Sequence, residues 1–193
     1  MYPLLDPQSA TGPAQELLAA TQKQLGRVPN LYRAMANSPK ALGSYLAFRG
    51  ALQGGALDSA MCERIALLSA QLNDCDYCIA AHTFRGSKIG MDAQDLAETR
   101  HAHSASPKIH AALTFVRELI DGKGAVAPPT RQALLDHGWS ATDVGEMVAH
   151  VALNVFSNYF KQVAEPALDF PPAPALEAHA SPTMPAQGKT GHD

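Results

Sequence analysis

Two cysteines and a histidine lie close together in NDCDYCIAAH, residues 73–82. Cys75 and Cys78 are separated by two residues, a spacing at which their sulfurs can form a disulfide with little backbone movement. Such a pair performs thiol–disulfide chemistry, binds a metal, or packs as small apolar side chains. The chain has three cysteines in total, so a framework of structural disulfides is not expected. The pair therefore indicates redox chemistry or metal binding.

The reactivity of the pair depends on where a helix begins. We expect Asp74 to be the N-cap of a helix that runs from Cys75 to about Lys88. Both sulfurs would then lie near backbone N–H groups without partners and near the positive end of the helix dipole. A free thiol has a pKa of about 8.5, whereas thiols in such positions have pKa values of about 3.5 to 7.5. The position therefore favours the reactive thiolate.

Two further side chains are candidates for proton transfer. His82 follows Cys78 by four residues, one turn along the same helix face, where it can accept or move a proton. Glu63 belongs to the preceding helix and would lie roughly 120° from Cys75 if the two helices were one. A break at Asn73–Asp74 would let the helices pack side by side and bring Glu63 to the cysteines. There we expect a partly buried carboxylate whose raised pKa lets it accept a thiol proton.

The four residues Glu63, Cys75, Cys78 and His82 form the pattern E-x11-C-x2-C-x3-H. This pattern resembles the active site of the alkylhydroperoxidase D-like (AhpD-like) members of the carboxymuconolactone decarboxylase superfamily. The segments RVPNLYRAMANSP and VALNVFSNYFKQVAEPALDFP resemble a subgroup called peroxidase-related, so the likeness covers most of residues 24–171. The resemblance implies an all-helical fold, a homotrimer or homohexamer, and antioxidant, thiol-dependent reduction of hydroperoxides or of a partner's disulfide.

The resemblance also implies a role for each residue of the pattern. Cys78 is similar to the cysteine that attacks peroxide, Cys75 to the resolving cysteine, and Glu63 with His82 to the proton relay. Tyr77 stands where the better-studied members have a further histidine, so we expect the relay to differ there.

The expected function is that of a thiol-dependent hydroperoxidase or disulfide oxidoreductase. Its substrate would be a small-molecule hydroperoxide, and its reductant an external dithiol, a lipoyl or thioredoxin-like protein, with no bound cofactor or metal. Three alternatives remain open: a carboxymuconolactone decarboxylase-type lyase, a non-catalytic redox sensor or interaction module, and a zinc-stabilised module. Zinc would need a fourth ligand from His101, His103 or His110. Cys62 has no spaced partner and is expected to be a small buried apolar residue.

The capping and helix-breaking residues along the rest of the chain mark the starts and ends of helices. No segment alternates apolar and polar residues, and no hairpin turn joins β-branched runs, so we predict an all-α fold. We expect a single domain of packed antiparallel helices over residues 1–170. The expected helical segments run from Gly12 to Gly26, from Asn30 to before Ser38, from Lys40 to Gln53 with Ser38 as N-cap and Pro39 as first helical residue, from Asp58 or Ser59 to Asn73, from Cys75 to Lys88, from Asp92 onward, from Ser106 to Gly122, from after Thr130 to His137 and from Ser140 to about Val163.

Composition limits the partners and the location. Residues 171–193 are rich in proline, alanine and small polar residues, and we expect this tail to be disordered. A formal charge of -3 provides no basic surface, so no nucleic acid partner is expected. No basic and apolar leader and no run of eighteen apolar residues is found, so we expect no membrane association. The same observations lead us to expect a cytoplasmic protein.

Overall fold

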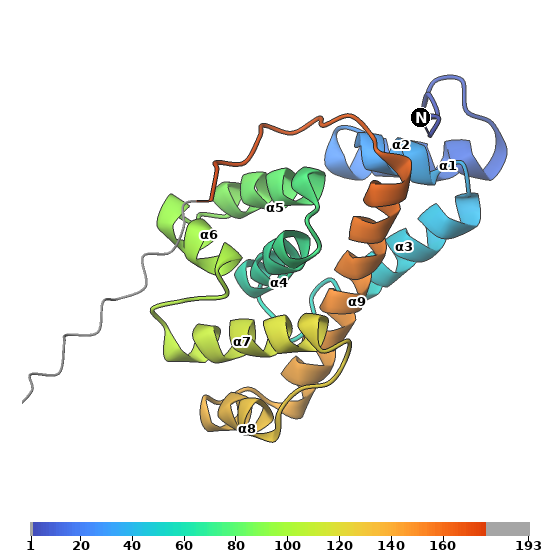
Figure 1. The fold of residues 1–193 in the computed structure, drawn as a ribbon. Coiled ribbons are helices and arrows are strands. Elements are labelled where there is room, and N and C mark those ends of the chain that lie inside the picture. The colour runs from blue at the N-terminus through green and yellow to red at the C-terminus, as the bar shows by residue number, and fades with distance from the viewer. Residues whose placement is uncertain (1, 177–193) are drawn as a thin grey trace, which may run out of the picture.

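The computed structural model describes residues 2–176. This part of the chain contains nine helices and no strand (Figure 1), which confirms the all-α fold. The helices are α1 (Gly12–Leu25), α2 (Asn30–Met35), α3 (Pro39–Ala51), α4 (Ser59–Leu72), α5 (Asp76–Lys88), α6 (Ala93–Arg100), α7 (Pro107–Asp121), α8 (Pro128–Asp136) and α9 (Ala141–Ala164).

Helix α4 is the central element of the fold. It contacts α5, α6, α7 and α9, and the last two lie on different sides of it in Figure 1. Its side chains Ile65, Leu67 and Leu68 have no solvent exposure. One cluster of buried side chains joins α4 to α7 and α9, and a second joins α1, α2 and α3 to the start of α5. Leu67 and Ala70 of α4 also belong to the second cluster, so α4 is packed on both sides.

Local signals set most of the helix starts. The side chains of Ser38, Asp58, Asp92 and Ser140 each accept a hydrogen bond from a backbone N–H in the first turn of the helix that follows. At Ser140 the capping box with Asp143 is complete. Each cap of this kind contributes about 1 kcal/mol. The helix starts predicted at these four residues are therefore confirmed.

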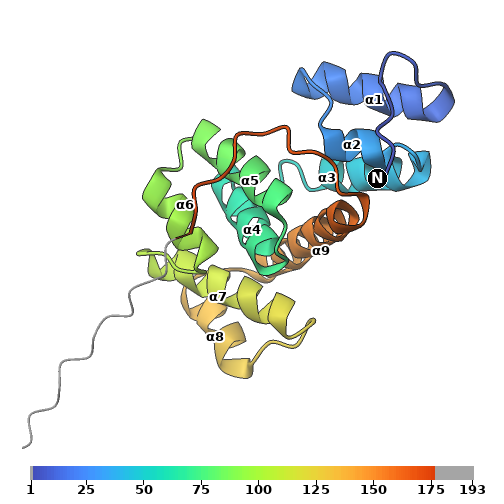
Figure 2. The same ribbon diagram turned by 45° about the horizontal axis from the view of Figure 1, so that its top comes forward.

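The break between α4 and α5 differs from the prediction in one respect. Asp74 is not an N-cap: its φ of 50° is left-handed, and it turns the chain between the two helices. The N–H of Cys75 then donates to the carbonyl of Ala70 at 2.9 Å. Cys75 itself becomes the N-cap of α5, which begins one residue later than predicted. The reversal lays α5 beside α4 (Figure 2).

A segment without helix follows α9 and returns across the molecule. Glu165 ends α9 in a left-handed conformation, and residues 165–176 then pass α5 and reach α6 (Figures 1 and 2). Phe170 packs on the rings of Tyr77 and Phe84, and Arg100 donates to the carbonyl of Pro174 at 2.7 Å. The first residues of the predicted tail thus contact the helices, whereas residues 177–193 lie outside the described part of the chain.

Across residues 2–176, none of the helices combines the length and the apolar character needed to cross a membrane.

Candidate active site

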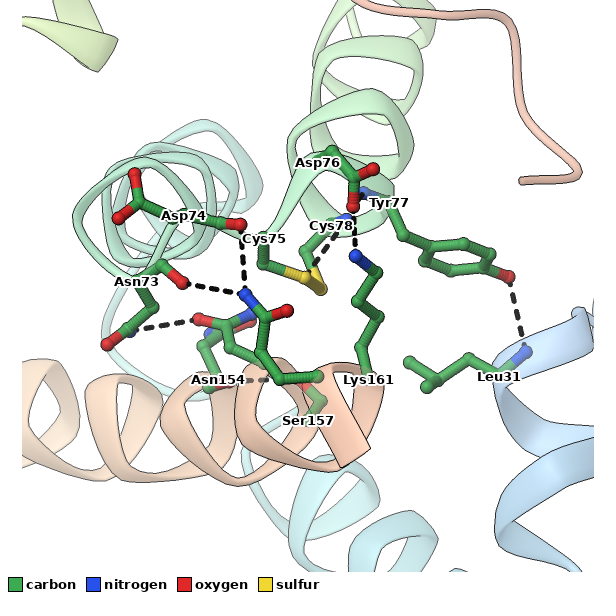
Figure 3. The surroundings of a disulfide bond; sticks show 12 residues. Leu31, Asn73, Asp74, Cys75, Asp76, Tyr77, Cys78, Asn154, Ser157 and Lys161 are labelled. Carbon is green, nitrogen blue, oxygen red and sulfur yellow. Dashed lines mark hydrogen bonds and ion pairs between the residues drawn. A yellow bond between two sulfur atoms is a disulfide. The ribbon is translucent and has the colours of Figure 1, made fainter. Parts of the chain in front are cut away.

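Cys75 and Cys78 form a disulfide at the start of α5, with their Cα atoms 5.2 Å apart (Figure 3). The Cys78 N–H donates to Cys75 Sγ at 3.3 Å. The hydrogen bond from the helix start therefore falls on Cys75, which favours negative charge on that sulfur when the disulfide opens. Cys75 has no solvent exposure, and Cys78 is 3% exposed.

Helix α9 holds the turn that carries the disulfide. The Gln162 side chain donates to the backbone carbonyls of Asn73 and Asp74, at 3.2 and 3.0 Å. Lys161 forms an ion pair with Asp76, the first residue of α5, and crosses beside the disulfide in Figure 3. These contacts tie both sides of the turn to one rigid helix.

Glu63 and His82 form the second part of the site. Nδ1 of His82 on α5 lies 2.7 Å from Oε2 of Glu63 on α4. His82 is buried, and Glu63 is partly buried beside it. The break between the two helices thus brings Glu63 to His82, one helical turn beyond Cys78.

Burial and charge determine the protonation of this pair. Burial lowers the pKa of His82, so the imidazole is neutral at neutral pH. Burial alone would raise the pKa of Glu63, but the hydrogen bond with His82 and the charges of Arg85 and Arg49 hold it below its ordinary value. The raised pKa predicted for Glu63 is therefore wrong, because the contact with His82, together with the charges of Arg85 and Arg49, outweighs the effect of burial. An ionised carboxylate only accepts, so Nδ1 carries the hydrogen and Nε2 is free to accept a proton.

Two cavities meet at His82. The larger has a volume of about 430 Å³, and the smaller, of about 20 Å³, is lined by Cys78. His82, Arg85 and Tyr45 line both cavities, whereas Cys75 lines neither. Cys78 is therefore the sulfur of the pair that lines a cavity, next to residues that also line the larger one.

Tyr77 does not take part in the His82–Glu63 contact. Its side chain points away from the disulfide toward Leu31 (Figure 3), whose N–H donates to the phenol oxygen at 3.3 Å. The phenol O–H donates to Asp169 at 2.5 Å, and Asp169 also pairs with Arg27 at 2.6 Å. Tyr77 thus links α5 to α2 and to the segment after α9. The side chain directly before Cys78 therefore has a structural role in this chain.

No sequence pattern predicted some of the side chains that line the larger cavity. Arg49 on α3 and Arg85 on α5 belong to no motif, although both line it. Cys62 also lines it, instead of being fully buried as expected, and its sulfur lies 3.4 Å from Nε2 of His150. Burial raises the pKa of Cys62 to about 11, so this thiol is neutral at neutral pH. In the sequence, only its position directly before Glu63 indicates that Cys62 lies near the site.

Two of the histidines considered as zinc ligands, His103 and His110, contact each other, and His103 also contacts Glu98. Nδ1 of His103 is 3.6 Å from Glu98, and the rings of His103 and His110 are 5.2 Å apart. Within residues 2–176, no group of three or more His, Cys, Asp or Glu side chains is placed to hold a metal ion.

Comparison with known proteins places this site in a family. The carboxymuconolactone decarboxylase family model matches residues 39–118, which include Glu63, both cysteines of the pair and His82. No curated protein matches the chain.

Several solved structures share the fold. A peroxidase-related protein from Ralstonia eutropha JMP134, described as an alkylhydroperoxidase AhpD core, has a TM-score of 0.76 at 22% identity, covering 87% of this chain and 91% of that one. A peroxidase-related protein from Silicibacter sp. TM1040 has a TM-score of 0.74 at 20% identity, covering 86% and 88%. The debrominase Bmp8 has a TM-score of 0.74 at 15% identity, covering 88% and 92%.

Fold and site together define a helical protein with a CxxC disulfide beside a Glu–His pair. Residues 39–118 match the carboxymuconolactone decarboxylase family, and the chain shares its fold with the peroxidase-related proteins above, one of them described as an alkylhydroperoxidase AhpD core.

Proposed function

We propose that the chain is a thiol-dependent oxidoreductase that reduces small-molecule hydroperoxides with its CxxC pair. The observation that carries the proposal is the shared cavity of Cys78 and His82, with Nδ1 of His82 held by Glu63. The peroxidase-related structures with the same fold support the same reading.

In the first step, Nε2 of His82 takes the proton of the reduced Cys78 thiol. The thiolate attacks the terminal oxygen of the hydroperoxide, the O–O bond breaks, and the alkoxide leaves as an alcohol with the proton returned by His82. Cys78 becomes a sulfenic acid. Glu63 keeps the imidazole in the tautomer that this step requires, because its carboxylate accepts from Nδ1.

In the second step, the Cys75 thiolate attacks the sulfur of Cys78. The S–S bond forms, and the hydroxyl of the sulfenic acid leaves as water after protonation. The N–H of Cys78 supports the charge on Cys75 before the attack. The disulfide present in the structure is the product of this step.

An external dithiol then regenerates the pair by thiol–disulfide exchange. Its thiolate attacks Cys78, the sulfur that lines a cavity, and Cys75 leaves as a thiolate. The second thiol of the reductant attacks the mixed disulfide, releases Cys78 and leaves the reductant oxidised. A lipoyl or thioredoxin-like protein supplies such a dithiol in the cytoplasm, where we place the protein, and no bound cofactor is needed.

An exposed apolar stripe on α9 supports assembly into a homotrimer or homohexamer. Four of its exposed apolar side chains lie within about 80° of one helix face: Val148, Phe156, Tyr159 and Val163. Contiguous apolar surface of this kind marks protein contacts. Light scattering should give the mass of three or six chains, and a monomer would contradict this part of the proposal.

Steady-state turnover of cumene hydroperoxide with dihydrolipoamide tests the function. The wild-type chain should consume both compounds, and Cys78→Ser should abolish the consumption. Cys62→Ser removes the third thiol, which lines the larger cavity, without changing the pair, so turnover that survives this change excludes Cys62 as the reacting thiol. A Cys78→Ser variant as active as wild type would refute the proposal. Decarboxylation of a carboxymuconolactone without any peroxide consumption would support the lyase alternative instead.

A further inference from the structure

Two arginines of the larger cavity differ from every other arginine of the chain. Six of the eight donate a hydrogen bond or form an ion pair within residues 2–176: Arg27, Arg33, Arg64, Arg100, Arg117 and Arg131. Arg49 and Arg85 have neither kind of contact with any residue in that range, although both are partly buried. Arg85 only lies near the Phe170 ring, 5.9 Å from its centroid. The two unpaired guanidinium groups line the same cavity.

A partly buried cation without a partner is unfavourable, because burial removes water that its donors would otherwise bind. Each guanidinium offers five donors in a planar fork that matches a carboxylate. The charge of Glu63 favours the charged form of Arg85, but its Oε2 is bound to His82, and Glu63 forms no hydrogen bond or ion pair with either guanidinium. With His82 and His150 neutral, the charged side chains that line the cavity, Arg49, Arg85 and Glu63, have a formal charge of +1. The charges of Asp58 and Glu146 act at the other end of the cavity, on Cys62 and His150. The cavity therefore suits an anion.

The rest of the lining suits an organic molecule. Leu52, Leu57, Ala66 and Leu153 form apolar wall, and the volume of about 430 Å³ lies in the range of small-molecule sites. An inorganic anion would leave this wall in contact with water. An anion with an apolar body fits both parts of the cavity.

The arginines also set the direction of such a ligand. Arg85 and His82 line the larger cavity and the smaller cavity of Cys78. A ligand held by its acid group at the arginines can therefore extend toward the reactive sulfur.

We infer that the substrate is an organic hydroperoxide that carries a carboxylate, with Arg85 and Arg49 binding the carboxylate and the apolar wall binding its body. This inference rests on the proposed function and names its substrate class. The two arginines are positioning residues for the reaction at Cys78.

A matched pair of substrates tests the inference by turnover. Cumene hydroperoxide and its para-carboxylated form differ only in the acid group. Wild type should prefer the carboxylated form by about tenfold or more in kcat/KM, since hydrogen bonds between charged groups commonly have this effect. Arg85→Gln and Arg49→Gln should each reduce the ratio, mainly through KM. Equal kcat/KM values in wild type, or a ratio unchanged in both variants, would overturn the inference.

Two further variants serve as controls. Lys40→Gln removes a positive charge from an exposed position at the start of α3, outside the cavity, and should keep the wild-type ratio. Arg85→Lys keeps the charge without the planar fork and should give an intermediate ratio. If Arg85→Gln does not fold, Arg85→Lys and Arg49→Gln carry the test, and wild-type ratios in both would overturn the inference.

Calorimetry provides a readout that does not depend on turnover. The oxidised wild-type protein should bind 4-isopropylbenzoate about tenfold or more tightly than 4-isopropylbenzyl alcohol or inorganic phosphate, and Arg85→Gln should remove this difference. Equal binding of the benzoate and the alcohol would overturn the inference even if peroxides are reduced. Selective benzoate binding without any peroxide turnover would overturn the proposed function and leave the acid-binding site in place.

Discussion

Nδ1 of His82 lies 2.7 Å from Oε2 of Glu63, although the two residues are 19 positions apart and belong to different helices. Because Glu63 is ionised, the shared hydrogen stays on Nδ1, and Nε2 of the imidazole is the proton acceptor of the site. Under the proposed function, a neutral histidine in this buried position activates the Cys78 thiol without an additional base.

Removing the charge of Glu63 should change both the rate and its pH dependence. The charge of Glu63 raises the pKa of His82, so Glu63→Gln should lower that pKa further and shift the acid limb of the rate to lower pH. The rate above the limb should fall by about 10²-fold, because the tautomer of His82 is no longer held. The measurement is the second-order rate constant of reduced protein with cumene hydroperoxide between about pH 4 and 8.

The matched control for this variant is Glu16→Gln, at an exposed position on α1. Glu16→Gln should keep the wild-type rate constant and the wild-type pH of the acid limb. An acid limb that moves to higher pH in Glu63→Gln would show that Glu63 does not act through His82.

Tyr77 should matter for stability and not for the proton relay. Tyr77→Phe removes the hydrogen bond with Asp169 and leaves the Leu31 N–H without its phenol acceptor. The free energy of unfolding in urea should fall by about 1–3 kcal/mol. The acid limb of the rate should not move, since Tyr77 does not contact His82.

Tyr2→Phe is the control for this variant, because the Tyr2 ring packs on Phe160 while its hydroxyl forms no hydrogen bond within residues 2–176. It should change stability by less than about 0.5 kcal/mol. A shift of the acid limb of the peroxide reaction rate in Tyr77→Phe would show that Tyr77 takes part in the proton relay.

Phe170 lies on the access route to Cys78, because it lines the small cavity at that sulfur. Phe170→Ala should speed reduction of the Cys75–Cys78 disulfide by dithiothreitol, measured by the rate of thiol release. Stability should fall by about 1–3 kcal/mol, less than for a fully buried phenylalanine. Leu168→Ala, at an exposed position of the same segment, should change neither quantity much. Equal or slower reduction in Phe170→Ala would show that the ring does not cover Cys78.

The parts of the structure that sequence could predict are those set by neighbouring residues. Ser38, Asp58 and Ser140 cap helices with their own side chains, so their positions follow from short patterns. The break at Asn73 was predictable for the same reason. The left-handed conformation of Asp74 was not, because non-glycine residues adopt it uncommonly, and the pattern fitted an N-cap equally well.

Contacts between distant segments explain the remaining differences. The pKa of Glu63 is lowered by its contact with His82 and further by Arg85 and Arg49. The two arginines come from α5 and α3, and no spacing rule predicts that they lie near Glu63. Tyr77 meets Asp169 across 92 positions, so its role could not be predicted from its place beside Cys78. The four-residue pattern predicted which side chains meet, but their charges depend on the whole fold.

The most direct test is intact-protein mass spectrometry of reduced protein before and after one equivalent of cumene hydroperoxide. Wild type should lose the mass of two hydrogen atoms as the disulfide forms. Cys75→Ser should hold a sulfenic acid on Cys78 that dimedone traps, and Cys78→Ser should form none. A sulfenic acid trapped on Cys75 in the Cys78→Ser variant, or no oxidation of wild type, would contradict attack by Cys78.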